Sequence, residues 1–470
     1  MSNTVSSAAQ PSANAFYRAV WRWHFYAGLY VVPFIIMLAI TGLAILWFTT
    51  IAPEYGDRLA VPQSRAALPI TAQSDFVAKA YPQGKITQYI APYSATNPAL
   101  FRVALDNGDR MIALDPYTGA IIQDVLQAGT WNDFFTRVHG SLFLGPKTGG
   151  LGDLLIETAA SLGIILLVTG LYLWWPRDGR GYRATLLPNF RLKGRLFWRE
   201  LHSGLGFYGS IIILFFFVSG LAWASVWGGK FVQAWSTFPA EKWDNVPLST
   251  LDHASMNHGA LKEVPWALEQ TLLPQSGSKQ GIEGLPHDVP VVLESIVALG
   301  RAIGFQGRFQ VAFPADEKGV WTLSQDSMSY DSPNPTADRT VHIDQYTGKI
   351  LASVSYADYS VPGKAMAVGI ALHEGQIGVW NIVLNFIFAS GMILISVSGI
   401  VMWWLRRPEK VLRFAPPPVD ANVPLWKGAA VIAVALSIAF PMAGVALFGA
   451  LIVDFVLISR VPLLRRFLKS

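Results

Sequence analysis

Long apolar runs alternate with long polar stretches along this 470-residue chain. Four of the runs are about 22 to 25 residues long, enough for a helix to cross the ~30 Å hydrocarbon core of a membrane at ~1.5 Å per residue. The first run is too long for a cleaved signal peptide and has no small-residue cleavage site, so we interpret it as a retained anchor. The four runs cover 25–48, 154–175, 205–227 and 381–405.

A fifth apolar stretch, 423–463, is interrupted by Pro441 and Gly444. We interpret it as a helical hairpin that turns between these two residues. A single kinked helix is the alternative, because proline is tolerated inside membrane helices. With the hairpin, the pattern predicts a helical membrane bundle of about six transmembrane helices.

The two long polar stretches show the same order of elements, which is typical of an α+β module. In each, a short helical pattern is followed by strands of period two and a D-x-Y-T-G turn. The first module is predicted to have a helix at 71–81, strands at 85–93, 99–106 and 110–115, a turn at 115–119 and a strand from Ala120; the second has a helix at 290–303, strands at 307–313, 320–325 and 339–344, a turn at 344–348 and a strand from Lys349.

These likenesses keep a constant spacing. Asp115 and Asp344, which begin the two turns, are 229 residues apart, and so are Thr169 and Ser398, which begin two Ser/Thr-Gly pairs in apolar runs. One offset shared by polar and apolar parts indicates an internal duplication. Each half would then consist of a helix, an external α+β module and a second helix, and the second half carries an extra external insert at 229–288.

Charge predicts which ends of the helices are cytoplasmic. The 176–199 loop carries seven Lys/Arg and one acid, whereas 51–135 has six basic and eight acidic residues and 229–372 has ten and fifteen. Short basic loops stay in the cytoplasm. We therefore expect a cytoplasmic N-terminus and two external modules in a multi-pass protein. The small net charge of +5 follows from this topology and shows no nucleic-acid signature.

Four histidines flank the four long apolar runs, and they form two matching pairs. His24 and His202 precede runs that align on the histidine, with glycine four residues later at Gly28 and Gly206. His139 and His373 precede runs that end in similar Trp-Trp motifs. Histidine is a poor lipid-facing residue, and at both edges of a membrane bundle it is a natural metal or haem ligand. A single interfacial histidine is usually only a polar boundary residue, but four in duplicated register favour ligation.

The chain contains no cysteine. This excludes disulfides, thiolate metal sites, iron–sulfur clusters and covalently attached c-type haem. The glycine-rich stretch 145–152 matches no nucleotide-binding motif. An electron donor that uses a flavin or a nicotinamide would therefore be a separate molecule.

The D-x-Y-T-G turns, flanked by H-x-x-x-G and TGLxxWW helices, resemble the PepSY-associated transmembrane family over about 16–410. Some members resemble two-haem siderophore reductases of the bacterial inner membrane. The resemblance implies two b-type haems held by His24, His202, His139 and His373. We call His24 and His202 the inner pair, because they are expected at the cytoplasmic edge, and His139 and His373 the outer pair, which is expected at the external edge. His139 lies farther from its apolar run than His373 does, so the outer pair is less regular than the inner pair.

Other residues are assigned supporting roles. Gly28 and Gly206 lie one turn from their histidines and would leave gaps for a porphyrin, and Arg22 and Arg199 would pair with its propionates. Glu157, an acid inside an apolar run, is expected to lie near the outer haem or to carry a proton. Substrate would contact Trp235, Trp243 and Trp266 in the insert, although these side chains are equally expected to seat the insert.

The four remaining histidines are weaker candidates. His253 and His258 lie in the insert at a spacing that a loop often shows by chance, so a metal or substrate site there is a minor alternative. We interpret His287 and His342 as ordinary surface or strand residues.

The sequence thus predicts transmembrane electron transfer. A cytoplasmic or quinol donor would supply the inner haem, and a periplasmic acceptor, by resemblance a ferric siderophore, would be reduced at the outer haem. Two alternatives remain: a membrane-anchored PepSY regulator that inhibits a protease, and a metal, haem or siderophore transporter. Continuous helices without central charges argue against the transporter.

The predicted segments follow from these boundaries. They are a disordered cytoplasmic N-terminus 1–15, a first helix 16–50, module 51–135, a second helix region 136–176, cytoplasmic loop 177–199, a third helix 200–228, insert 229–288, module 289–360, a fourth helix region 361–405, linker 406–422, hairpin 423–463 and cytoplasmic tail 464–470.

Overall fold

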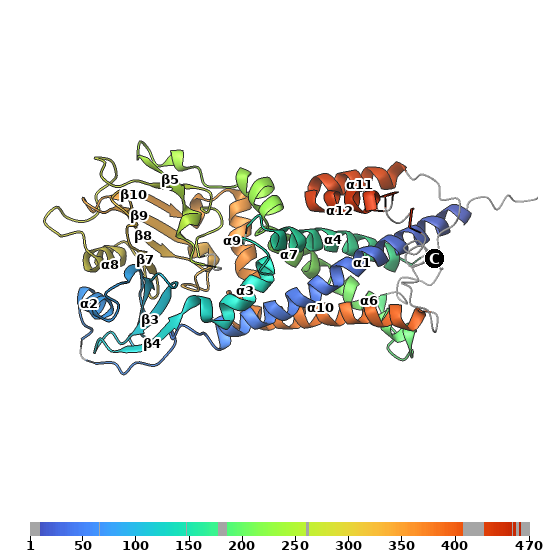
Figure 1. Ribbon diagram of the computed structural model, residues 1–470, viewed down its shortest axis with the longest axis horizontal. Coiled ribbons are helices and arrows are strands. Elements are labelled where there is room, and N and C mark those ends of the chain that lie inside the picture. The colour runs from blue at the N-terminus through green and yellow to red at the C-terminus, as the bar shows by residue number, and fades with distance from the viewer. Residues whose placement is uncertain are drawn as a thin grey trace, which may run out of the picture. The chain divides into compact units, whose positions relative to one another are not determined.

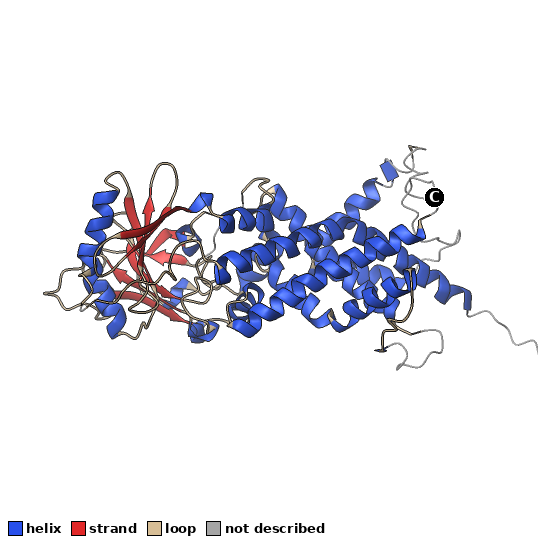
Figure 2. Ribbon diagram, turned by 90° about the horizontal axis from the view of Figure 1, so that it is seen from below, coloured by secondary structure: helices blue, strands red, loops and turns tan. Residues whose placement is uncertain are grey.

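The chain divides into two compact units, each of which is described by itself (Figures 1 and 2). The helical unit comprises Met1–Ile40, Gly140–Lys230 and Phe386–Ser470, and the sheet unit comprises Thr41–His139 and Phe231–Asn385. Among the described residues, the strands, which are red in Figure 2, all lie within the ranges of the sheet unit.

The computed structural model describes most of the chain, and several expectations fall outside it. These concern residues 1–9 of the N-terminus, 177–185 of the predicted 177–199 loop, 408–422 of the linker and the tail 464–470. The described residues are 10–64, 66–146, 148–176, 186–259, 263–407, 427–453, 455–456 and 460–461.

The helical unit is built from long apolar helices. Three are long and apolar enough to cross a membrane: α1 (Gln10–Leu46), α4 (Leu151–Trp174) and α10 (Val379–Arg406). A fourth span is formed if α6 (Arg195–Tyr208) and α7 (Ser210–Leu221) count as one, so the described residues support three or four spans and do not confirm six.

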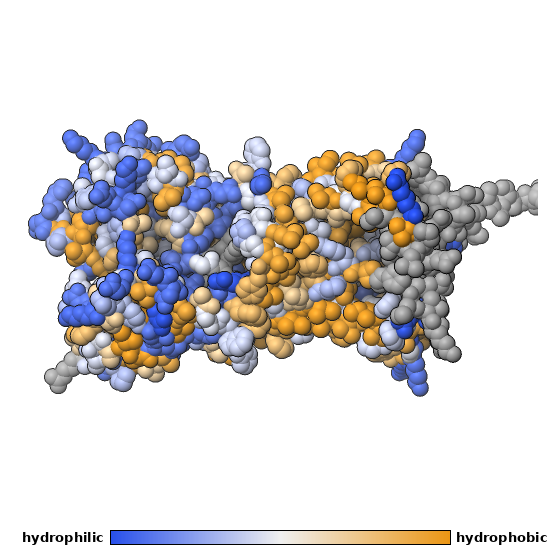
Figure 3. Space-filling model, in the orientation of Figure 1, coloured by the Kyte–Doolittle hydropathy of each residue, from blue (hydrophilic) through white to orange (hydrophobic). Residues whose placement is uncertain are grey.

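Apolar packing explains this arrangement of helices. Val31, Ile35 and Ala39 lie four residues apart on one face of α1 and pack with Ile213 of α7 and Met392 of α10. Apolar residues also cover the outer surface of these helices in Figure 3, and several of their large side chains are exposed. An apolar exterior of this extent is the expected boundary with lipid.

The expected continuous helix at 205–227 is wrong. α6 and α7 meet at Gly209 with a bend of 64°. A Cβ atom at Gly209 would lie 2.7 Å from the carbonyl oxygen of Leu205, so the bend depends on a residue without a side chain. Beyond α7 the chain forms a π-helix at Ser225–Val232.

The stretch 423–463 forms two short helices, α11 (Lys427–Ala439) and α12 (Pro441–Val453). They pack against each other, and α12 also packs against α4, which is the hairpin arrangement and not a single kinked helix (Figure 1). Each helix has 13 residues, fewer than the ~20 that a perpendicular span needs.

In the sheet unit, the strands of the two modules form one eight-stranded antiparallel sheet and not a separate sheet for each module. The module elements confirm the period-two predictions. They are α2 (Ile70–Ala80), β1 (Lys85–Ile90), β2 (Ala99–Ala104), β3 (Arg110–Leu114) and β4 (Ile121–Leu126) in the first module, and α8 (Leu293–Ala302), β7 (Gln310–Ala312), β8 (Val320–Gln325), β9 (Arg339–Asp344) and β10 (Ile350–Ser355) in the second.

The two modules join through β1 and β7, in the order β10-β9-β8-β7-β1-β2-β3-β4. Tyr89 pairs with Val311 at this junction. Val77 of α2 and Ile296 of α8 both belong to one large hydrophobic core on the sheet, with strand residues such as Phe101. The order of strands is therefore the same when read outward from the junction in either direction.

The D-x-Y-T-G turns form as predicted. The Asp115 carboxylate accepts hydrogen bonds from the Tyr117 amide and the Thr118 hydroxyl, and Gly119 has a positive φ of 75°. Asp344 accepts the amides of Tyr346 and Thr347 in the same way. The repeated Asp and Gly thus serve turn geometry, since the carboxylate accepts the turn's hydrogen bonds and the glycine takes the left-handed backbone conformation.

Four further elements complete the sheet unit. β5 (Leu248–Asp252) and β6 (Leu272–Pro274) form a small hairpin-like sheet in the insert. α3 (Trp131–Ser141) and α9 (Val361–Glu374) are separate helices that precede α4 and α10. Their separation explains why His139 and His373 lie outside the apolar runs.

Candidate functional site

The inner histidines lie close together inside the helical unit, and their ring planes are nearly perpendicular. His24 of α1 and His202 of α6 have ring centroids 6.3 Å apart, and their ring planes are at 86° to each other. The structure therefore brings together the two residues that the sequence pairs.

Each inner imidazole is held through Nδ1. His24 Nδ1 lies 3.0 Å from the hydroxyl oxygen of Thr169 on α4, and His202 Nδ1 lies 2.9 Å from that of Ser398 on α10. With Nδ1 occupied in both rings, the Nε2 atoms are the nitrogens available to a shared ligand.

Glycines lie against these rings. A Cβ at Gly170 would be 3.2 Å from His24 Cε1, and one at Gly399 would be 3.5 Å from His202 Cε1. Of the two predicted gaps, Gly28 is more open, since a Cβ there would be 3.9 Å from the nearest atom, whereas one at Gly206 would be 3.5 Å from its nearest atom. Glycines thus lie on the neighbouring helices against the imidazole rings, and also one turn after each histidine on its own helix.

The outer histidines lie in the sheet unit. His139 Nδ1 of α3 is 2.8 Å from the Thr41 hydroxyl oxygen of α1, and its Cε1 would be 3.5 Å from a Cβ at Gly42. His373 lies near the end of α9, where burial and the neighbouring His139 lower the pKa of its imidazole to about 3. A ring that stays neutral keeps a lone pair for a metal.

Polar side chains fix the two helices that carry the outer histidines. The Glu54 carboxylate accepts the amides of Trp131 and Asn132 at 3.0 and 2.8 Å, at the start of α3. The Asn385 amide donates to the His373 carbonyl oxygen at 2.8 Å, at the end of α9. These contacts satisfy two of the free amides at the start of α3 and one of the free carbonyl groups at the end of α9.

The two predicted propionate partners have other contacts. Arg22 donates to the Tyr26 hydroxyl at 3.2 Å and lies over the Tyr26 ring. Arg199 forms an ion pair with Glu200, with 2.9 Å between the guanidinium nitrogen and the carboxylate oxygen. Arg406, which the sequence did not single out, lies over the rings of Trp21 and Phe25 at 5.2 and 5.5 Å.

The three tryptophans of the insert do not share one surface. Trp243 and Trp266 are buried in the sheet unit, with 7% and 1% of their surface exposed, whereas Trp235 is 86% exposed. The first two side chains seat the insert, and Trp235 alone of the three offers substantial area to another molecule.

A second imidazole pair lies in the sheet unit. His253 Nε2 and His342 Nε2 are 2.9 Å apart, and both rings are fully buried beside Trp243. His253 Nδ1 donates to the Thr271 carbonyl at 2.6 Å. His342 is a strand residue as expected, but it is not on the surface, because the insert covers this part of the sheet.

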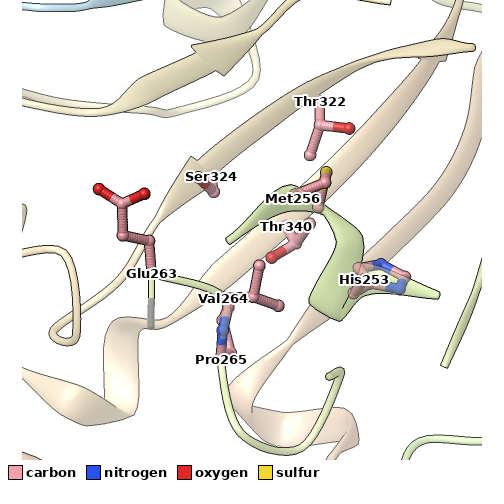
Figure 4. Close-up of a pocket in the computed structure, with 8 residues that line it drawn as sticks. All are labelled: His253, Met256, Glu263, Val264, Pro265, Thr322, Ser324 and Thr340. Carbon is pink, nitrogen blue, oxygen red and sulfur yellow. The ribbon is translucent and has the colours of Figure 1, made fainter. Parts of the chain in front are cut away.

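A small pocket with a volume of about 20 Å³, room for about one water molecule, lies next to this pair (Figure 4). His253 and Glu263 stand at opposite ends of it in Figure 4. Its lining residues are His253, Met256, Glu263, Val264, Pro265, Thr322, Ser324 and Thr340.

His258 belongs to a buried ion-pair network. Its Nδ1 is 2.7 Å from Glu263, whose other carboxylate oxygen is 2.6 Å from the buried Arg102. Burial opposes ionisation, but Arg102 and His258 lower the pKa of Glu263 to about 2. The carboxylate thus stays charged and joins the insert to β2.

Glu157 of α4 has a structural contact that the sequence did not reveal. Its carboxylate oxygens accept the amides of Val226 and Trp227 at 3.0 and 2.9 Å, near the start of the π-helix. The Trp227 indole in turn donates to the Ala439 carbonyl at 3.0 Å. Within the described ranges, no three His, Cys, Asp or Glu side chains converge as a metal cluster.

Comparison with known proteins bears on the family. No curated protein matches the sequence. The family described as PepSY-associated TM region matches residues 21–406, which is most of the chain. The matched part contains all four paired histidines, both turns and the four long apolar runs. The chain therefore belongs to the PepSY-associated TM region family.

Proposed function

We propose that this protein holds two b-type haems and passes electrons between the two sides of the membrane. The observation that carries the proposal is the inner pair, His24 and His202. These two imidazoles would hold one haem iron between them, because their ring centroids are 6.3 Å apart, a separation that leaves room for a metal ion. Bound haem would supply one-electron chemistry.

The chain's own residues supply positioning. The Thr169 and Ser398 hydroxyls hold the inner rings, and Thr41 holds His139 of the proposed outer site. The chain contains no cysteine, so thiolate ligation and covalent attachment of the haem are excluded.

Stoichiometry tests the proposal directly. The pyridine haemochrome assay on purified protein is expected to approach two haems per chain. Substitution of His202 by Ala and of His139 by Ala should each remove one haem and leave a different spectral species. A ratio near zero after expression with ample haem would contradict the proposal, and loss of the same species in both variants would contradict the pairing.

Orientation is part of the same proposal. Seven basic residues in 176–199 support a cytoplasmic position for this loop and an inner-membrane, multi-pass protein with a cytoplasmic N-terminus. Reporter fusions after Arg183 and after Gly119 are expected to report opposite compartments. Equal signals would remove the two-sided electron path.

We further propose a ferric siderophore as the acceptor on the external side. One electron per iron, supplied by a reduced flavin or quinol, would convert Fe(III) to Fe(II), which hard oxygen ligands hold less tightly. The support is family resemblance, together with the exposed Trp235 in the insert.

Reoxidation kinetics test the acceptor. Dithionite-reduced protein is expected to be reoxidised faster with a ferric hydroxamate than with buffer, and an Fe(II) chelator should then capture iron. His373→Ala should stop this reaction while the inner haem is still reduced. Equal rates with siderophore and buffer would leave only electron transfer.

An internal duplication underlies the paired sites in this proposal. It is supported by the strand order around β1 and β7 and by the hydroxyl contacts of His24 and His202, which come from Thr169 and Ser398 at the repeat offset. Each half would thus contribute one ligand to each haem.

Two other functions remain as competitors. A protease-inhibiting PepSY regulator would explain the sheet unit but not the paired histidines, and it would purify without colour. The bend at Gly209 resembles the broken helices of transporters, so the expected helix continuity no longer argues against transport. Uptake of labelled siderophore into liposomes without an electron donor would favour that function.

A further inference from the structure

A hydroxyl directly before a glycine holds three of the paired histidines. In each case the Oγ atom lies 2.8–3.0 Å from Nδ1, and the glycine faces the Cε1 atom of the same ring. The contacts join His24 to Thr169-Gly170, His202 to Ser398-Gly399, and His139 to Thr41-Gly42.

The helix backbone determines which partner donates. The Thr169 hydroxyl lies 2.7 Å from the Ile165 carbonyl, and the Ser398 hydroxyl lies 2.6 Å from the Ile395 carbonyl. A carbonyl only accepts, so the single hydroxyl proton is committed to the backbone and the oxygen can only accept from the imidazole.

The inner imidazoles must therefore carry their proton on Nδ1. His202 Nδ1 also lies 3.0 Å from the Ile395 carbonyl oxygen, which leads to the same assignment. In this tautomer Nε2 is a bare lone pair, which is the form that binds a metal.

The glycine lets the ring approach the helix that holds it. A methyl group at Gly170 would crowd His24 Cε1 at 3.2 Å. Each Ser/Thr-Gly pair therefore sets both the position of Nδ1 and the plane of the ring, and the planes of the inner pair are at 86°.

We propose that Thr169 and Ser398 are positioning residues that fix the tautomer and the ring plane of the inner haem-ligating histidines, and that Thr41 positions the ring of His139. This inference rests on the proposed haem binding. Because the acceptor is a neutral hydroxyl and not a carboxylate, the imidazole gains little anionic character. The device thus orients the ligand without making it strongly basic.

The test uses the ring planes as its readout. Perpendicular axial imidazoles give ferric low-spin haem a strongly anisotropic EPR signal, whereas near-parallel rings give a rhombic one. The wild-type inner haem is expected to give the anisotropic signal. Thr169→Val, which removes the acceptor, should convert or broaden that signal and weaken haem retention at the inner site about 10- to 100-fold.

Two controls separate positioning from packing. Thr169→Ser keeps the hydroxyl and should keep the wild-type signal. Thr158 lies on the same helix, and its hydroxyl lies 2.7 Å from the Leu154 carbonyl without a histidine, so Thr158→Val should also leave the signal unchanged. If Thr169→Val does not fold, Ser398→Ala tests the opposing ring.

The outcomes distinguish this inference from the proposed function. Wild-type protein without haem would overturn both. Wild-type protein with two haems and an unchanged EPR signal in Thr169→Val and Ser398→Ala would overturn the positioning role alone. An equal change in Thr158→Val would also overturn it, because the effect would then come from helix packing.

Discussion

The helical unit and the sheet unit each contain a pair of close histidines, and the pairs differ in what can lie between the rings. His24 and His202 have centroids 6.3 Å apart, a separation that accommodates a metal ion. His253 and His342 have centroids 4.9 Å apart, and their Nε2 atoms are in direct contact at 2.9 Å.

Hydrogen bonding accounts for the difference. In the inner pair both rings donate from Nδ1, so both present a lone pair at Nε2. In the sheet unit, His253 donates from Nδ1 to the Thr271 carbonyl, so its Nε2 must accept. His342 therefore donates from Nε2 to His253, and its Nδ1, 3.0 Å from the Thr322 hydroxyl oxygen, accepts from that hydroxyl. Two residues of one type thus form a ligand site or a closed structural link according to their tautomers.

The largest expected effect separates the two pairs by haem content. His24→Ala should lower the haem content from two per chain to one. His253→Ala should leave it at two, because the closed pair has no free lone pair. The haemochrome assay measures both, and loss of haem in His253→Ala would erase the distinction.

Glu263→Gln should destabilise the sheet unit by about 3–5 kcal/mol, since it leaves the Arg102 charge buried without its partner. The insert that carries His253 would loosen, while the inner pair would be unaffected. Hydrogen exchange of residues 263–275 measures the effect in the full-length protein. The exposed Glu241 in the same insert is the control, and equal exchange in Glu241→Gln and Glu263→Gln would contradict the role of the ion pair.

Acid should act on the sheet-unit pair in a defined pH range. Burial lowers the pKa of His253 to about 4 and that of His342 well below its usual value. Above pH ~6.5 both the folded and the unfolded imidazole are neutral. Below it the unfolded His253 binds a proton that the folded ring does not, so stability should fall by about 1.4 kcal/mol per pH unit until pH reaches about 4.

The comparison with His253→Gln isolates this contribution. Burial raises the pKa of Asp326 to about 7 and of Asp338 to about 8, and these groups give the opposite slope. The thermal midpoint of the wild type minus that of His253→Gln should therefore decrease as the pH is lowered from 7 to 4. Parallel curves would contradict it.

The smallest expected effect concerns ring placement. Gly170→Ala would bring a methyl group to 3.2 Å from His24 Cε1, so the inner haem should shift its EPR signal slightly and stay bound. Gly163→Ala is unsuitable as a control, because the new methyl group would clash with the Phe217 ring. A methyl group at Gly391 would enter open space. Gly391→Ala should leave the signal unchanged.

Local pattern made much of the fold predictable. Period-two alternation placed seven of the eight sheet strands within a few residues, and the two turns formed because Asp and Gly are required by their geometry. Strand β7, Gln310–Ala312, is shorter than the expected 307–313. The pairing of His24 with His202 was also predicted, since both align in the repeat.

Contacts between distant segments were not predictable from one sequence. Nothing in the pattern shows that β1 pairs with β7, because edge pairing depends on backbone groups that every residue has. The burial of Trp243 and Trp266 and the contact of His253 with His342 depend on where the insert folds back. The bend at Gly209 lay inside an uninterrupted apolar run, which periodicity interprets as one helix.

The β1–β7 junction has a consequence for how the two modules can exist. Each of these strands has a module partner on one side and the other module on its second side. A chain with a single module would leave that side as an open row of amide and carbonyl groups, free to recruit any extended strand. When both modules are in one chain, these backbone groups pair with each other within the molecule. The two modules then form a single unit of folding, and separating them would expose an unpaired strand edge on each.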